Sequence, residues 1–227
     1  MKKLASILAA TILSVSVSSV NAEMLSVGIT ANGGVLDVTG KETFNSKVRT
    51  KSDELGMAYA SGFAELHLPI NLGPGNMRVG LSYVPYALES ETTSSVQLVN
   101  IQQNGTASAT QKVQVDIEDL RTMYLSYHIN MFFLKAGYVE ADLITNESLA
   151  TGSVYGNAKL EGTFAAIGFD KPLTNSRFPD GMFIRGEVSA SEYDSISLTS
   201  TGSDNVNVID ITGLDGTNVA ISVGRSF

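Results

Sequence analysis

The sequence predicts an all-β chain, an antiparallel up-and-down transmembrane β-barrel of eight strands. Two observations predict this fold: segments in which apolar and polar residues alternate with a period of two, and connections that are alternately short and long. A third is that the polar positions hold mostly Gly, Ser, Thr and Asn with few charges. Small polar groups suit the lumen of an eight-stranded barrel, because its interior is just wide enough for its own side chains.

The first 22 residues have the layout of a secretory signal peptide. Lys2 and Lys3 precede an uncharged, mostly apolar stretch, and small residues end at Ala22. A membrane anchor is the alternative, but serines interrupt the stretch, which is shorter than the ~20 residues that a spanning helix needs. We therefore expect residues 1–22 to be removed and residues 23–227 to form one domain.

Composition excludes several functions. The chain has 15 Lys and Arg against 23 Asp and Glu, and two of those lysines lie in the signal peptide, so the mature chain is strongly acidic. Nucleic acid is therefore not expected as a partner, since phosphate binding needs a basic surface. The chain has no Cys, which excludes disulfides, thiol chemistry and thiolate metal sites. We expect no cofactor and no metal.

Eight segments alternate between apolar and polar residues, as strands with two unlike faces do. They cover residues 25–31, 58–68, 79–83, 123–129, 134–138, 165–169, 184–190 and 219–223. The pattern is weakest in the sixth, where Ala165, Ile167 and Phe169 are assigned to the apolar face. No later window approaches 18 continuous apolar residues, so no transmembrane helix is expected after the signal peptide.

The connections are sorted by length. Three are short: "PINLGPGN", a tight step at Asn130, and "KPLTNSRFPDG". The long connections cover residues 33–55, 86–115, 141–158 and 192–214. In an up-and-down barrel this order puts all long loops at one end, as in outer membrane barrels with short periplasmic turns. Ten strands are the alternative, if residues 86–115 or 192–214 contribute a full membrane hairpin.

The chain ends on "NVAISVGRSF". Val219, Ile221, Val223 and Phe227 alternate with smaller or polar residues, and we expect this strand to pair with the first, because a bilayer forbids open sheet edges. The motif resembles the carboxy-terminal signature of bacterial outer membrane proteins, which in that class is read by the barrel assembly machinery. The mature chain resembles the small eight-stranded OmpA/OmpX-like barrels. The resemblance implies export through the periplasm and a location in the cell outer membrane, with its lipid as a partner.

Aromatic residues on the apolar face fall near the strand ends. They are Tyr83, Tyr127, Tyr138 and Phe227. Aromatic girdles at this height mark the two membrane interfaces of outer membrane barrels.

Five charged residues are assigned to the lumen. They are Glu65, Arg78, Lys135, Arg185 and Glu187, with His67 and His128 close by. Buried charges must pair, so we expect a network of salt bridges and hydrogen bonds. The network is either a plug that closes the interior or a gate through which ions leak when pairs exchange. The narrow interior of eight strands favours the plug.

Ser126 and His128 share a face at a spacing of two and have the chemistry of a nucleophile and a base, which makes a catalytic role an alternative. Both lie beside the short turn at Asn130, toward the periplasm. The enzymes among similar small barrels carry their residues at the external rim. The sequence therefore predicts that the protein is not an enzyme.

The long connections are the remaining candidates for function. Asp204, Asp210 and Asp215 offer oxygen ligands, but their spacing does not match a calcium-binding EF-hand loop. We interpret them as a solvated external surface, with Asp215-Gly216 as a hairpin tip. Loops rich in Thr, Ser, Val and Ile could extend the barrel above the membrane as a sheet open to β-augmentation or adhesion by an external partner that the sequence does not identify.

These observations predict an outer membrane barrel with a structural or surface-interaction role, long external loops and a packed polar lumen. The first alternative is a narrow porin-like channel for ions or small solutes. The second is a soluble periplasmic β-barrel binding protein.

Overall fold

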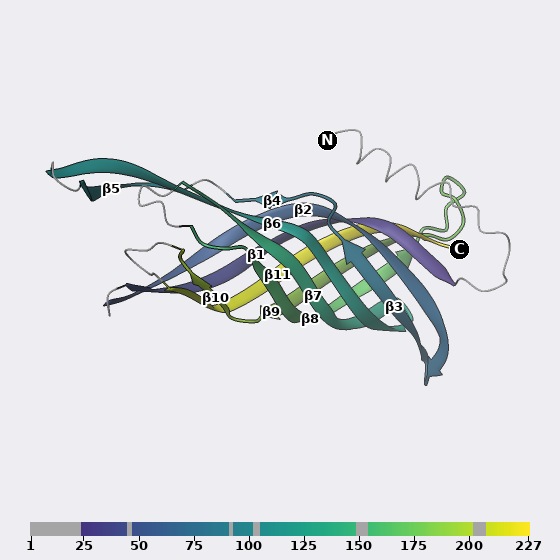
Figure 1. The fold of residues 1–227 in the computed structure, drawn as a ribbon. Helices are drawn as coiled ribbons and strands as arrows, with labels where there is room; N and C mark the ends of the chain where they lie inside the picture. Colours follow the sequence, from purple (N-terminus) through teal and green to yellow (C-terminus); the bar gives the residue numbers. More distant parts are fainter. Residues whose placement is uncertain (1–23, 45–46, 91–92, 102–104, 149–153, 202–207) are drawn as a thin grey trace.

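A computed structural model of the chain describes residues 24–44, 47–90, 93–101, 105–148, 154–201 and 208–227. One antiparallel sheet curls into a tilted barrel whose strands run on beyond it on the left of Figure 1. No helix in the described residues is long and apolar enough to cross a membrane. The predicted signal peptide lies outside these residues.

Eight strands form the closed ring, each pairing antiparallel with the next. They are β1 (Leu25–Phe44), β2 (Lys47–Leu72), β3 (Gly75–Tyr83), β6 (Gly105–Ile129), β7 (Phe132–Ser148), β8 (Ala158–Pro172), β9 (Met182–Tyr193) and β11 (Val208–Ser226). Three short strands lie off the ring: β4 (Leu88–Glu89) and β5 (Thr93–Ile101) pair with β6, and β10 (Ile196–Thr199) pairs with β11. The predicted eight-stranded barrel is confirmed. Where the two long segments are described, they add no strand to this closed ring, so the ten-stranded alternative is wrong.

The carboxy-terminal strand closes the ring. Strand β11 pairs with β1 from Ser26 opposite Ser226 to Thr43 opposite Val208. At the very end, the Phe227 N–H donates to the Leu25 carbonyl at 2.8 Å, and the Met24 N–H donates to the Phe227 carbonyl at 2.8 Å. The last residue is therefore part of the ladder that removes the sheet edge, as lipid requires.

The outward face of the ring is apolar. Each ring strand contributes a large aliphatic side chain that is between 44% and 60% exposed. These residues are Ile29, Leu66, Leu81, Leu125, Leu134, Ile167, Val188 and Ile221. A continuous apolar belt of this kind would not be stable in water, and it fits the lipid-facing band of an outer membrane barrel.

Tyrosines border this belt at both ends. On the side of the long connections, Tyr83 is outward-facing and donates to Asp119 at 2.7 Å, and Tyr138 lies nearby on β7. On the side of the short turns, the Tyr127 hydroxyl donates to the Leu72 carbonyl. The belt therefore runs between these two levels, which we take as the membrane interfaces.

Much of what the sequence predicts as long loops is strand. Strands β1, β2, β6, β7 and β11 continue past the belt without a break. The prediction of a hairpin tip at Asp215-Gly216 is wrong, because both residues lie inside β11, with Asp215 opposite Asp37 on β1. The irregular residue is instead Gly213, whose φ is +68°, and here the register of β11 against β1 shifts by one residue. This β-bulge bends the strand and lets it continue.

The short turns follow the prediction. Strands β6 and β7 are joined by a tight turn in which Asn130 has a φ of +54°, a left-handed conformation that Asn tolerates. Gly73 and Gly181 take positive φ in the other two short turns.

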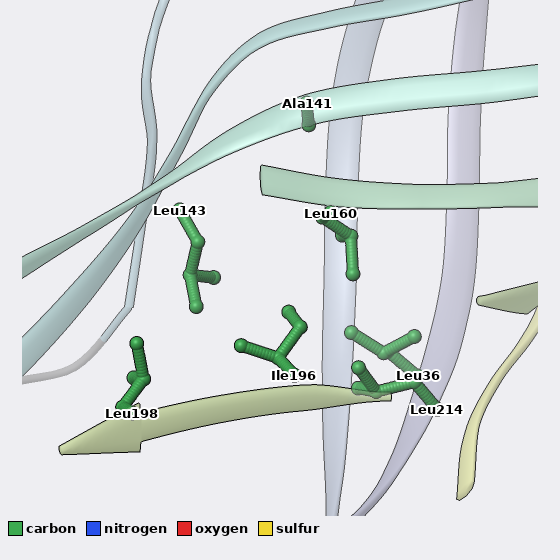
Figure 2. Packing of buried hydrophobic residues seen from close by; sticks show 7 residues of the cluster. All are labelled: Leu36, Ala141, Leu143, Leu160, Ile196, Leu198 and Leu214. Carbon is green, nitrogen blue, oxygen red and sulfur yellow. The ribbon is translucent and has the colours of Figure 1, made fainter. Parts of the chain in front are cut away.

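The external end of the barrel is filled by an apolar cluster (Figure 2), here called the external apolar cluster. It consists of Leu36, Ala141, Leu143, Leu160, Ile196, Leu198 and Leu214, all at most 9% exposed. Strand β10 supplies Ile196 and Leu198, so this short strand covers the mouth of the ring from one side.

Candidate functional site

All five charged residues that the sequence assigns to the lumen point into it. Glu65 comes from β2, Arg78 from β3, Lys135 from β7, and Arg185 and Glu187 from β9. They lie between the external apolar cluster and the short turns, at the height of the lipid-facing belt. Strand alternation places them there, since each follows an outward-facing residue.

The centre of the site is an ion pair between Arg185 and Glu65. The Arg185 Nη1 donates to Glu65 Oε1 at 2.5 Å and Nη2 donates to Oε2 at 2.9 Å, a bidentate contact. Glu65 is 0% exposed and Arg185 is 2% exposed. The bidentate geometry matters, since burial of each charge alone would be very costly.

Asp170 joins Arg185 and Arg78. It accepts from Arg185 Nε at 2.6 Å and from Arg78 Nη1 at 3.3 Å, while Arg78 Nη1 also lies 3.3 Å from Glu65. Asp170 is not among the residues that the sequence assigns to the lumen. The alternation extends to it, because Ala166, Gly168 and Asp170 continue the inward face of β8, but this segment has the weakest pattern of the eight.

A second ion pair lies beside the first. The Lys135 ammonium donates to the Glu187 carboxylate, and it lies 4.3 Å from the centroid of the Tyr124 ring. The Tyr124 hydroxyl in turn donates to Glu65 Oε1 at 3.0 Å. Tyr124 therefore links the two pairs, by a hydrogen bond on one side and a cation–π contact on the other.

The network is balanced in charge. Three cations, Arg78, Lys135 and Arg185, meet the three carboxylates of Glu65, Asp170 and Glu187. Aromatic rings enclose the central guanidinium, whose Cζ lies 5.0 to 5.4 Å from three phenylalanine centroids: Phe63, Phe133 and Phe183. The site is thus a packed unit with no carboxylate left over for a bound cation.

Ser126, His128 and Asp170 form a chain of contacts. Ser126 Oγ lies 3.0 Å from His128 Nε2, and His128 Nδ1 lies 3.5 Å from Asp170 Oδ2. This order of groups matches a serine–histidine–aspartate triad. However, Ser126 is 1% exposed and neither cavity described below is lined by it. The hydroxyl is therefore buried, and the geometry supports a buried hydrogen-bonded core.

His67 lies on β2 opposite Arg78 of β3. Its Nε2 lies 2.7 Å from Ser26 Oγ, which is also 2.9 Å from Ser226 Oγ. These contacts join β2, β1 and β11 near the short turns, so His67 supports the closure of the ring.

Two spaces lie on either side of the charge network. One, of about 120 Å³, lies toward the external apolar cluster and is lined in part by Lys135, Arg185 and Glu187. The other, of about 560 Å³, opens at the short turns and is lined in part by Arg78 and Asp170. The network therefore separates a small internal cavity from a wide vestibule.

Outside the lumen, an ion cluster lies just beyond Tyr138 on the outer face. Glu140 Oε1 accepts from Arg121 Nη2 at 2.7 Å and from Lys159 Nζ at 2.8 Å. Hydrogen bonds from Arg121 and Lys159 lower the pKa of the Glu140 carboxyl to about 2. The cluster joins β6, β7 and β8 above the lipid belt.

The acidic residues of the last long connection show no metal site. Asp210 accepts a hydrogen bond from Ser197 Oγ at 2.7 Å, Asp215 lies within β11, and Asp204 lies outside the described residues. Across the residues with described placement, no three His, Asp or Glu side chains come close enough to hold a metal ion.

No protein-family model matches the chain, and no curated protein matches its sequence. Solved structures do resemble it. OprG from Pseudomonas aeruginosa is 12% identical with a TM-score of 0.47, covering 91% of this chain and 99% of OprG. The outer membrane protease OmpT from Escherichia coli is 10% identical with a TM-score of 0.41, covering 94% and 100%. Ail, the attachment invasion locus protein of Yersinia pestis, is 11% identical with a TM-score of 0.32, covering 87% and 99%.

The strand pairing itself establishes the fold. A closed antiparallel ring of eight strands has an apolar outer face and a polar lumen whose charges are paired. This combination places the chain in a bilayer and is inconsistent with the soluble periplasmic alternative. The protein has the fold of a small transmembrane β-barrel, as outer membrane proteins do.

Proposed function

We propose that the protein is a closed, non-enzymatic barrel that supports the outer membrane surface and presents sheets to partners outside the cell. The observation that carries this proposal is the balanced network around Arg185 and Glu65. It fills the lumen at the height of the lipid belt and separates the internal cavity from the vestibule.

Ion passage would require this network to open. The Arg185 guanidinium would have to leave two carboxylates inside a narrow interior, and breaking a buried pair costs about 3–5 kcal/mol. The external apolar cluster is a second obstacle, because an ion would have to cross side chains of Leu and Ile. Two closures of different chemistry in series support a plugged lumen.

The external part of the molecule is a continuous sheet. Strands β1, β2 and β11 continue beyond the lipid belt in one ladder, with Thr43 still paired with both Val48 and Val208. A sheet holds its surface in one conformation, whereas a loop would lose conformational entropy when a partner bound. This supports a role in contact with external partners.

The test is single-channel conductance of residues 23–227 refolded into a planar bilayer, with insertion first confirmed by gel shift. We expect insertion without steady conductance. Arg78→Ser and Lys135→Ser should lower the unfolding temperature and leave conductance flat, while Lys171→Ser, at an exposed position near the short turns, should change neither. Steady conductance of the unmodified protein, or its rise in the lumen variants, would refute the plug and establish the channel.

A further inference from the structure

One edge of β2 is open outside the membrane. Strand β1 pairs with β2 along its whole length, from Phe44 opposite Lys47 to Leu25 opposite Leu66. On the other side, β3 ends at Tyr83, opposite Gly62. Within the part of the chain that the structure describes, no strand pairs with residues 47–59 on that side. This is a long sheet edge, which natural proteins usually shorten or cover.

The hydrogen-bonding groups at this edge can be assigned by parity. The Ala60 N–H points to the open side, where it donates to the Tyr86 hydroxyl at 2.5 Å, and the His67 N–H points to the β1 side, where it donates to the Met24 carbonyl. Backbone groups of alternate residues point the same way in a strand. Even-numbered residues such as Thr50 and Ser52 therefore direct their N–H and C=O groups to the open edge.

The side chains along the edge are exposed on both faces. Residues 51–56 are all exposed. Lys51 and Asp53 lie on one face at 2.8 Å from each other, with 82% and 61% of their side chains exposed. Lys51 and Asp53 lie on either side of Ser52. If two copies of this strand pair antiparallel with Ser52 opposite Ser52, each lysine therefore lies opposite an aspartate.

We propose that this edge pairs with the same edge of a second copy held in an opposing membrane. This proposal rests on the surface-interaction role proposed above and names the partner. The two β2 strands run antiparallel about a two-fold axis at Ser52, so that each Lys51 lies opposite the Asp53 of the other copy. Thr50 lies opposite Glu54 in the same register.

The charge pattern favours pairing between copies in two facing membranes over pairing between copies side by side in one membrane. Two barrels in the same membrane are related by an axis along the membrane normal, which sets their β2 strands parallel and puts Lys51 opposite Lys51. Like charges directly opposite destabilise a strand pair. An antiparallel pair needs the second copy upside down, which is how a barrel in a facing membrane is presented.

The dimensions allow this contact. Ten residues separate Ser52 from Gly62, which lies level with Tyr83 at the edge of the lipid belt. At ~3.4 Å per residue and a strand tilt of ~40°, Ser52 stands about 25 Å above the membrane. Two membranes joined at Ser52 would therefore lie about 50 Å apart.

The first experiment is a charge exchange in phospholipid vesicles carrying the full mature barrel. Unmodified vesicles should tether, measured by light scattering and by the gap between paired membranes in electron cryomicroscopy. Lys51→Asp vesicles and Asp53→Lys vesicles should each tether roughly tenfold less, because like charges then meet at both positions. A mixture of the two should recover, since every pair is again opposite in sign. Lys171→Asp, far from the edge, is the matched control.

The second experiment uses the absence of cysteine from the chain. Residues opposite each other in a hydrogen-bonded antiparallel pair have Cα atoms ~5.5 Å apart, which suits a disulfide. Ser52→Cys vesicles should give disulfide dimers on oxidation once they tether. Thr50→Cys alone should give none, and Thr50→Cys vesicles mixed with Glu54→Cys vesicles should give dimers across the two populations.

The outcomes separate this proposal from the closed-barrel function. Failure of the mixed charge variants to recover, equal tethering by all variants, or Ser52→Cys dimers in vesicles that do not tether would each overturn the pairing. A barrel that inserts, does not conduct and does not tether leaves the closed barrel intact. A barrel that conducts overturns the proposed function, whatever its tethering.

Discussion

Replacing Arg185 by Met tests whether the lumen network is a structural plug. The guanidinium makes four hydrogen bonds to Glu65 and Asp170, between 2.5 and 3.0 Å long. Met fills a similar volume but leaves Glu65, which is fully buried, with only Arg78 at 3.3 Å and Tyr124 as partners. Breaking a buried pair in this way costs about 3–5 kcal/mol. We expect the free energy of unfolding to fall by that amount.

A double variant separates the pair from general loss of packing. Glu65→Gln with Arg185→Met removes one charge of each sign and leaves Arg78 paired with Asp170. Its destabilisation should be at least ~2 kcal/mol smaller than the sum of the two single changes, because each single change leaves a buried charge without its partner and the double variant removes both charges. Arg177→Met, at an exposed position in the turn before β9, is the control and should stay within ~0.5 kcal/mol of the unmodified protein.

The assay is urea unfolding in lipid vesicles, followed by gel shift and by tyrosine fluorescence, since the chain has no Trp and eight Tyr. A structural plug is refuted if Arg185→Met costs under ~1 kcal/mol, which is the range of a surface pair, or if the double variant is as unstable as the sum of the two single variants.

Three further predictions follow from the same structure. Gly80→Ala should cost about 1–3 kcal/mol in urea unfolding, because its Cβ would lie 2.4 Å from the Tyr124 ring, whereas Gly33→Ala, with no atom near its Cβ, should be neutral. Leu198→Ala should cost about 2–5 kcal/mol yet leave single-channel conductance flat, because the ion network remains. Glu140 has a lowered pKa in the fold, so its stabilisation is present above its ordinary value of 4.5 and is lost as the pH falls toward about 2; Glu140→Gln should flatten the pH dependence of unfolding across that window.

The ring was predictable because lipid imposes a regular pattern. One face of every membrane strand must be apolar, so alternation marks each strand, and Leu125 and Ile221 are outward as expected. The external halves of the strands carry no such mark. Residues 51–56 of β2 are exposed on both faces, so no side-chain period distinguishes this strand from a loop. Its conformation is set by pairing with β1, which the sequence alone does not display.

For the candidate site, the sequence predicts which face of a strand a residue lies on, but not which residues pair. Parity along a strand placed Glu65 and Arg185 on the inward face, but their pairing depends on the stagger of β2 and β9 across the lumen, which no local pattern encodes. Asp170 lies near the end of β8, just before a segment with two prolines, where the alternation of apolar and polar residues is weakest. The sequence pattern therefore did not identify it as a lumen residue. Tyr124 lies on the same inward face of β6 as Ser126 and His128, but its hydrogen bond to Glu65 depends on the space left by Gly80.

The bulges at Asp119 and Gly213 show where residues can be inserted into the strands or deleted from them. Each inserts one residue into a strand, Asp119 with a φ of +51°, and so reverses which residues beyond it face inward. Elsewhere above the membrane, inserting or deleting one residue in a strand would turn Leu36 and its neighbours from the inward to the outward face. Inserting or deleting two residues would leave each side chain on its present face. Length variation among descendants of this sequence should therefore come in pairs of residues within the strands, with odd steps confined to the bulges and the tips.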